Sequence, residues 1–166
     1  MRRFFLLILL LGCGYSTHLV NIKDICVKPV TTSVSLTSQE RAYSEYNSYP
    51  LLLDKLLTNK IIEEINLRGA SLNNSVSAYR LETNIYRYKK ESLRYKDNDE
   101  VSEQRLKLFV EAKLFSPQGE LVKEKKIIGQ TTFFLSGPYK ISEEEAIQDL
   151  IEDTAQRIVE TIVSDW

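Results

Sequence analysis

The strictest constraint on the fold is the alternation of apolar and polar side chains from Glu103 to Phe115. The apolar positions are Leu106, Leu108, Val110, Ala112 and Leu114, and the intervening ones are Arg105, Lys107, Phe109, Glu111, Lys113 and Phe115. Successive side chains of a strand point to opposite faces of its sheet. The pattern therefore predicts an antiparallel strand with one face buried and the other open.

Similar runs on both sides of this segment predict its neighbours in the sheet. In Tyr79 to Tyr88, one face carries Tyr79, Leu81, Thr83 and Ile85, and the other carries Tyr86 and Tyr88. The turn from Ser116 to Gly119 leads into a returning strand, Leu121 to Phe134, whose register stays open because both faces mix Lys with Ile. Ile25 to Val30 predicts a first strand, and the Ser-, Thr- and Tyr-rich segment from Thr31 to Tyr49 predicts an extended loop.

Two segments carry apolar residues at helical spacing. Pro50 opens the first, whose stripe is Leu53, Leu56, Leu57, Ile61 and Ile65, and Gly69 closes it. Ser142 caps the second, with Glu145 three residues on, and its stripe is Ile147, Ile151, Ala155, Ile158 and Ile162. The order β-α-β-β-β-α predicts an α+β fold, a two-layer sandwich with two helices on one face of a four-stranded mixed sheet. We expect one domain over residues 24–166.

The first thirteen residues have the layout of a secretory signal. Arg2 and Arg3 precede a short apolar run, Phe4 to Leu11, which is too short to span a bilayer. The junction Leu10-Leu11-Gly12-Cys13 resembles a bacterial lipobox. We therefore expect residues 1–12 to be removed as a lipoprotein signal peptide, with Cys13 lipidated and residues 13–23 forming a short tether. An ordinary cleavable signal with an incidental cysteine is the alternative.

Composition and motifs favour a protein without catalytic chemistry. The formal net charge is −1, and loss of the two signal arginines brings it to about −3, so nothing indicates a nucleic-acid partner. The chain has no phosphate loop, nucleophile elbow or cluster at metal-ligand spacing, and its single histidine, His18, lies in the tether. Cys26, in an apolar stretch, is expected to be a buried small hydrophobe. We expect the protein to have no catalytic activity and to bind no metal or cofactor. A small hydrolase is a further alternative, against which the missing nucleophile–base pair counts.

Two surfaces are candidates for binding. Basic residues (Arg87, Lys89, Lys90, Arg94 and Lys96) are interleaved with Tyr86, Tyr88 and Tyr95, which suits a phosphorylated, partly apolar ligand. A solvated hairpin tip is the alternative. The aromatic residues Tyr86, Tyr88, Phe109 and Phe115 on the uncovered face of the sheet predict a partner interface, and scattered exposed aromatics are the alternative.

Several segments together resemble one family. They are Gly12 to Tyr15, Ile25 to Val30, Leu57 to Glu64 with Arg68-Gly69, Ser116 to Val122, and the last helix at Glu145 to Ile147, Leu150 and Ala155 to Val159. The chain resembles the LptE family, the lipopolysaccharide (LPS)-assembly lipoproteins of Gram-negative outer membranes. The resemblance implies the same β-α-β-β-β-α sandwich, with no reaction catalysed.

The resemblance also implies partners and contact residues. A member of this family plugs the outer-membrane β-barrel LptD, assists its assembly and contacts LPS. Family members have basic LPS-contact positions in a hairpin of the sheet and just before the last helix. Lys140 matches the position before the last helix, and Arg94 and Lys96 lie near the position in the hairpin. Gly14 is not Asp, which by analogy with enteric sorting favours the outer membrane over retention in the inner one. We expect the lipid-anchored chain on the periplasmic side of that membrane. A lipoprotein that activates a peptidoglycan synthase remains the alternative, although a tether of about ten residues favours work at the membrane itself.

Overall fold

Three long strands form the centre of the structure, a computed structural model that describes residues 24–34, 49–96 and 100–163. They are β4 (Tyr79–Tyr95), β5 (Val101–Phe115) and β6 (Leu121–Phe134), which form an antiparallel meander. The shorter strands are β1 (Asp24–Val27), β2 (Thr31–Thr32) and β3 (Ser71–Leu72). The helices are α2 (Leu53–Leu67) and α3 (Glu143–Ile158), and α3 continues into a π-helical turn, η1 (Val159–Val163). The predicted signal peptide, Cys13 and the tether lie outside the described residues.

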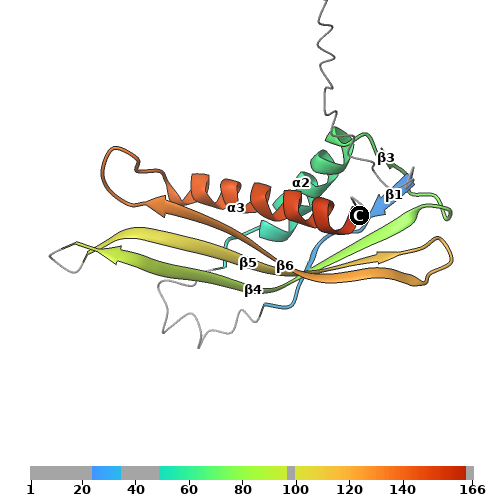
Figure 1. The fold of residues 1–166 in the computed structure, drawn as a ribbon, viewed down its shortest axis with the longest axis horizontal. Helices are drawn as coiled ribbons and strands as arrows, with labels where there is room; N and C mark the ends of the chain where they lie inside the picture. The colour runs from blue at the N-terminus through green and yellow to red at the C-terminus, as the bar shows by residue number, and fades with distance from the viewer. Residues whose placement is uncertain (1–23, 35–48, 97–99, 164–166) are drawn as a thin grey trace, which may run out of the picture.

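The strands form one mixed sheet with both helices on the same side, so the predicted α+β two-layer architecture is confirmed (Figure 1). The order is β3-β1-β4-β5-β6, with β1 parallel to β3 and β4, and with β2 also paired to β4. The sheet has six strands rather than the expected four. The additional strands, β2 and β3, have two residues each, too few to show an alternating pattern.

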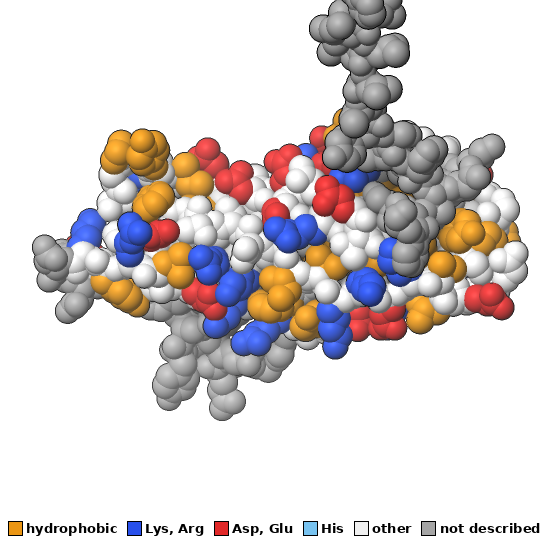
Figure 2. Space-filling model, viewed as in Figure 1, with side chains coloured by type: hydrophobic (Ala, Val, Ile, Leu, Met, Phe, Trp, Pro, Cys, Tyr) orange, Lys and Arg blue, Asp and Glu red, His pale blue; other side chains and the backbone are white. Residues whose placement is uncertain are grey.

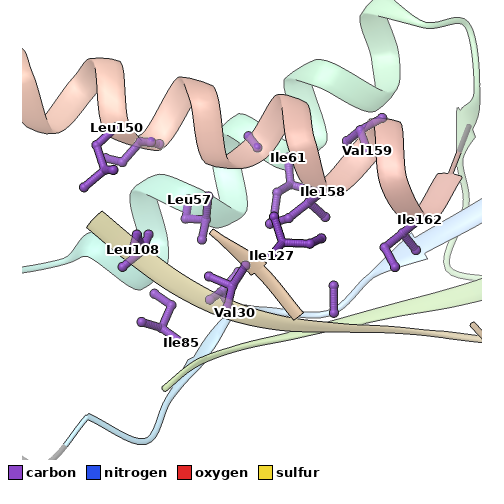
Figure 3. Packing of buried hydrophobic residues seen from close by; sticks show 14 of the residues in the cluster. Val30, Leu57, Ile61, Ile85, Leu108, Ile127, Leu150, Ile158, Val159 and Ile162 are labelled. Carbon is purple, nitrogen blue, oxygen red and sulfur yellow. The ribbon is translucent and has the colours of Figure 1, made fainter. Parts of the chain in front are cut away.

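The alternation from Glu103 to Phe115 is confirmed along β5. Leu106, Leu108, Val110, Ala112 and Leu114 are all buried under the helices. Figure 3 shows how this face meets the helices, with apolar side chains from α2, α3 and the sheet converging in one core. Its labelled members are Val30, Leu57, Ile61, Ile85, Leu108, Ile127, Leu150, Ile158, Val159 and Ile162.

The register of β6, which the sequence left open, is set by its pairing with β5. Ile127 pairs with Val110 and Phe133 with Gln104, so both odd-numbered side chains enter the core. Ile128 faces the other way and is 46% exposed. Gly129 lies on the core side directly against α3, where a Cβ atom would come within 1.8 Å of Thr154 Oγ1. The helix therefore approaches the sheet at a point where only glycine fits.

The buried stripes of both helices differ in part from the expected ones. In α3, Ala146 and Thr154 are fully buried while Ile147 is half-buried, because the contact with Gly129 fixes the rotation of the helix. In α2, Leu56 is 36% exposed. This helix begins at Leu53 rather than at Pro50, since Leu52 takes a left-handed conformation with φ 61°. The predicted cap of α3 is confirmed: the Glu145 backbone N–H donates to Ser142 Oγ at 3.1 Å.

Two further expectations concern the N-terminal part of the chain. Cys26 is half-buried rather than buried, and its thiol donates to Asn74 Oδ1 at 3.3 Å. In the segment expected to be an extended loop, Thr31 and Thr32 instead form β2 along the edge of β4. The rest of the segment lies largely outside the described residues.

Candidate functional site

The three predicted LPS-contact residues lie at one end of the sheet, which we call the basic end. Arg94 on β4 pairs with Glu103 on β5, and Glu103 pairs with Phe134 on β6. Phe134 in turn forms a parallel bridge with Lys140. These four residues thus cross the sheet in one row, and Lys96 follows Arg94 toward the hairpin tip. The ends of β4 and β5 next to their hairpin and the loop from β6 to α3 lie at the same end of the molecule (Figure 1).

Local structure fixes the backbone of Lys140 and leaves its side chain in solvent. Gly137, with φ 93°, turns the chain after β6, and the Lys140 N–H donates to the Gly137 carbonyl at 3.3 Å. The next residue, Ile141, donates its N–H to the Phe134 carbonyl at 3.3 Å. The Lys140 side chain is exposed and forms no ion pair with any carboxylate in the described residues. Lys140 is therefore an exposed cation at a fixed position of the backbone, where an anionic ligand can reach it.

The hairpin cations differ from Lys140 because each has an acidic partner. Arg94 Nε lies 3.3 Å from Glu103 Oε2, and Lys96 Nζ lies 3.3 Å from Glu100 Oε2. The Arg94 side chain is 72% exposed, so solvent screens this pair strongly. An anion that binds Arg94 or Lys96 competes with these carboxylates, whereas one that binds Lys140 does not.

Exposed aromatic rings accompany these cations, as an amphiphilic ligand would require. Tyr139, beside Lys140, is 78% exposed, and Tyr95, beside Arg94, is 60% exposed. Tyr139 was not among the residues singled out from the sequence. Its position in the Gly137-Pro138-Tyr139 turn, directly before a basic residue, was the signal that could have identified it.

The structure divides the basic cluster that the sequence suggested. Lys90 points to the helix side of the sheet, where its ammonium contacts Glu143 at 2.6 Å with only 10% of the side chain exposed. This ion pair attaches the start of α3 to β4. Arg87 and Lys89 lie on the opposite side of the sheet. The five basic residues therefore do not form one ligand surface.

The sheet side opposite the helices, which we call the open face, carries three of the four predicted interface aromatics. Phe109 and Phe115 alternate with the buried residues of β5, and Tyr86 is 37% exposed. Cations lie over these rings: Arg80 at 4.8 Å from the Phe115 centroid, Arg87 at 5.4 Å from Phe109, and Lys126 at 5.9 Å from Tyr86. The Tyr86 and Phe109 centroids are 6.1 Å apart.

The placement of Tyr88 on the open face was wrong. A β-bulge lies between Ile85, which pairs with Val110, and Arg87, which pairs with Phe109. The additional residue, Tyr86, shifts the alternation by one position, so Tyr88 points into the core and is 7% exposed. Its ring meets Tyr49 edge-on with centroids 6.1 Å apart. Burial, followed by the charge of Glu143, raises the pKa of the Tyr88 hydroxyl above its ordinary value.

One carboxylate on the open face has a strongly perturbed proton affinity. Glu91 accepts from Lys89 Nζ at 2.6 Å and lies 2.9 Å from Lys107 Nζ. These two ammonium groups, Lys89 first, lower the pKa of Glu91 to about 2. The arrangement is an ion-pair bridge between two strands, and it needs no catalytic role.

No group of three or more His, Cys, Asp or Glu side chains within residues 24–34, 49–96 and 100–163 is placed to hold a metal ion. Among the same residues, no helix is both long and apolar enough to cross a membrane.

Comparison with known proteins decides the family. The model of the family LptE: Lipopolysaccharide-assembly matches residues 30–165. The chain belongs to the LptE family. No curated protein matches the sequence significantly.

Solved structures share the fold at low sequence identity. A minor lipoprotein from Acinetobacter baumannii superposes with a TM-score of 0.56 at 18% identity, over 86% of this chain and 93% of that one. Hypothetical protein CT253 from Chlamydia trachomatis gives 0.53 at 11% identity, over 84% and 94%. The rare lipoprotein B from Shewanella oneidensis gives 0.50 at 17%, over 84% and 92%.

Membership of the LptE family supports a role for the chain as an LPS-assembly lipoprotein. The match includes the two sheet hairpins and α3, and therefore every residue of the basic end and of the open face.

Proposed function

We propose that this LptE-family chain is an outer-membrane lipoprotein, anchored through Cys13 on the periplasmic side, that plugs the LPS-inserting β-barrel LptD and assists its assembly. It contacts LPS through the basic end, and it catalyses no reaction. The observation that carries the proposal is the family match over residues 30–165. Family membership favours this role over activation of a peptidoglycan synthase.

The geometry supports a division of labour along the sheet. β1 begins at Asp24, and its neighbour Ile25 pairs with Tyr79 at the start of β4. The basic end lies at the other end of the meander, twelve residues along β5 from Phe115 to Glu103. At about 3.3 Å per residue the two ends are about 40 Å apart. In this proposal the anchored start of the domain and the LPS contact lie at opposite ends of the sheet.

The chemistry of the basic end suits the phosphorylated part of LPS. A phosphate oxygen is a strong acceptor for ammonium and guanidinium donors, and the exposed Tyr139 and Tyr95 rings can cover sugar or acyl groups. Lys140 is the primary contact, because its ammonium is exposed and has no carboxylate partner in the described residues. Arg94 and Lys96 contribute less, since each must first leave its acidic neighbour.

Lys140→Asp tests the LPS contact directly. We expect LPS binding to weaken at least about five-fold, the equivalent of about 1 kcal/mol, because a cation is replaced by an anion. Lys55→Asp, at an exposed position of α2, is the matched control and should leave binding unchanged. Binding would be measured with purified LPS, with the melting temperature of each variant recorded alongside. Equal binding by Lys140→Asp and wild type would place the LPS contact elsewhere.

The barrel partnership is tested by purification with the lipid anchor intact. A tagged full-length chain should recover a large β-barrel from solubilised outer membranes in a fixed molar ratio. Recovery of only periplasmic or inner-membrane proteins would overturn the proposed function.

A further inference from the structure

The open face is electrically asymmetric along its length. Its rows across β4, β5 and β6 follow from the strand register. The three rows nearest the start of β4 contain Arg80, Lys113 and Lys126 against Glu82, Glu111 and Glu124, which is electrically neutral. The next three rows contain Arg87, Lys89, Arg105 and Lys107 against the single carboxylate of Glu91. We call these three rows the basic half.

Two arginines of the basic half remain available to a partner. Glu91 is occupied by Lys89 and Lys107 at 2.6 and 2.9 Å, so it neutralises neither arginine. Arg105 donates from Nε to Thr132 Oγ1 at 3.3 Å, and Arg87 lies over the Phe109 ring. Within the described residues, Arg87 and Arg105 form no ion pair with a carboxylate.

An apolar patch lies beside these arginines. Phe109 pairs with Arg87 on one side and with Ile128 on the other, and Ile128 is 46% exposed. The bulge adds Tyr86, whose ring contacts Phe109. In Figure 2, which views the sheet from its side, Lys and Arg side chains lie beside apolar ones in the lower part of the molecule. Aromatic rings and arginines around an apolar centre are the composition enriched at protein interfaces.

We propose that the basic half of the open face docks against a carboxylate-bearing protein surface, with Arg87 and Arg105 as its charged anchors and Phe109, Tyr86 and Ile128 as its apolar centre. Arginine suits this task because its planar guanidinium binds a carboxylate in bidentate fashion. The residues are spread over three adjacent strands of a sheet, which suits another protein surface better than a small ligand, whose sites are concave. The inference rests on the proposed function, in which the partner is the barrel, and it predicts that the contacted wall of the barrel is acidic.

The test is the molar ratio of barrel to full-length lipidated chain after affinity purification in graded NaCl. Arg87→Glu with Arg105→Glu should lower that ratio about ten-fold, because like charges then face each other across the interface. Wild-type recovery should also fall as NaCl rises, through screening of exposed charges. Lys55→Glu with Lys125→Glu makes the same change of charge at two exposed positions off the open face, and should leave the ratio unchanged.

The double variant Arg87→Gln with Arg105→Gln removes both charges without reversing them. Its melting temperature should equal that of the wild type, which shows that the fold is intact, and it should lower the molar ratio of barrel to chain less than the double Glu variant does. Wild-type recovery of the barrel together with full recovery by both Arg variants overturns the docking surface and leaves the proposed function standing. Failure of the wild-type chain to recover any barrel overturns both. Equal loss in the Arg and Lys variants also refutes the docking surface, since net charge alone would then explain the result.

Discussion

Gly129→Ala should destabilise the fold because α3 lies too close to β6 for any side chain at this position. The added Cβ would lie 1.8 Å from Thr154 Oγ1, 2.8 Å from Thr154 Cβ and 2.9 Å from Thr154 Cα. A change of rotamer could move the hydroxyl, although it would break the bond from Thr154 Oγ1 to the Leu150 carbonyl at 2.6 Å. It cannot move Cα or Cβ, which belong to the helix itself. The helix must therefore shift away from the sheet.

The size of the effect follows from two opposing contributions. In a strand, alanine is favoured over glycine by about 0.5–1 kcal/mol, so without the contact the change would stabilise the protein. Carbon atoms pack at about 3.5–4.0 Å, so α3 must move locally by about 0.6–1 Å, which forfeits a quarter to a half of the dispersion energy along that contact. Overpacking of this kind costs about 1–3 kcal/mol or more. We expect the free energy of unfolding to fall by about 2 kcal/mol.

Urea unfolding followed by circular dichroism measures this change. The control is Lys125→Ala, at an exposed position of the same strand, whose free energy of unfolding should stay within about 0.5 kcal/mol of the wild-type value. Thr154→Ala combined with Gly129→Ala should recover only part of the loss, because the Cα and Cβ contacts persist. A Gly129→Ala variant as stable as wild type, or more stable, would refute the close approach of α3 to β6.

Two further predictions concern buried and charged groups. The Tyr88 hydroxyl is buried with no hydrogen-bond partner among the described residues, so Tyr88→Phe should leave stability unchanged or raise it by about 1 kcal/mol in urea unfolding. A clear loss would reveal a missing partner, and Tyr86→Phe on the open face serves as the control. The pKa of Glu91 is lowered to about 2 in the folded protein, whereas an unfolded glutamate has a pKa of about 4.3. Its ion pairs therefore stabilise the fold fully at pH values above about 4.3, and this stabilisation is lost as the pH falls toward 2. Wild type should therefore exceed Glu91→Gln in unfolding free energy at pH 7, and the difference should shrink between about pH 4.5 and 2; a difference independent of pH would contradict this pairing.

Sequence predicted the elements whose signals are local. The two-residue period of β5 and the cap at Ser142 depend on neighbours a few residues away, and both are confirmed. The family resemblance, carried by short segments along the chain, is confirmed by the match over residues 30–165. The strand from Leu121 to Phe134 has the predicted bounds, since Gly119 before it and Gly137 after it turn the chain.

The candidate sites could be predicted only in part, because their geometry depends on residues distant in sequence. Arg94 and Lys96 belong to a basic cluster in the sequence, and Lys140 became a candidate through the family resemblance. That Lys140 remains without an acidic partner in the described residues, while Arg94 meets Glu103 across the hairpin, depends on strand pairing. Likewise, no sequence pattern placed Lys90 against Glu143, 53 residues away.

The sequence by itself determined the three long strands, the two helices and their arrangement in two layers, because apolar periodicity acts within each of these segments. Tertiary structure decided which side chains share a face. The bulge at Tyr86 exists only against β5, and it moved Tyr88 from the open face into the core. The contact of Gly129 with Thr154 fixed the rotation of α3. A single-residue shift in a strand reverses every following side chain, so only the paired sheet could define the surface left for a partner.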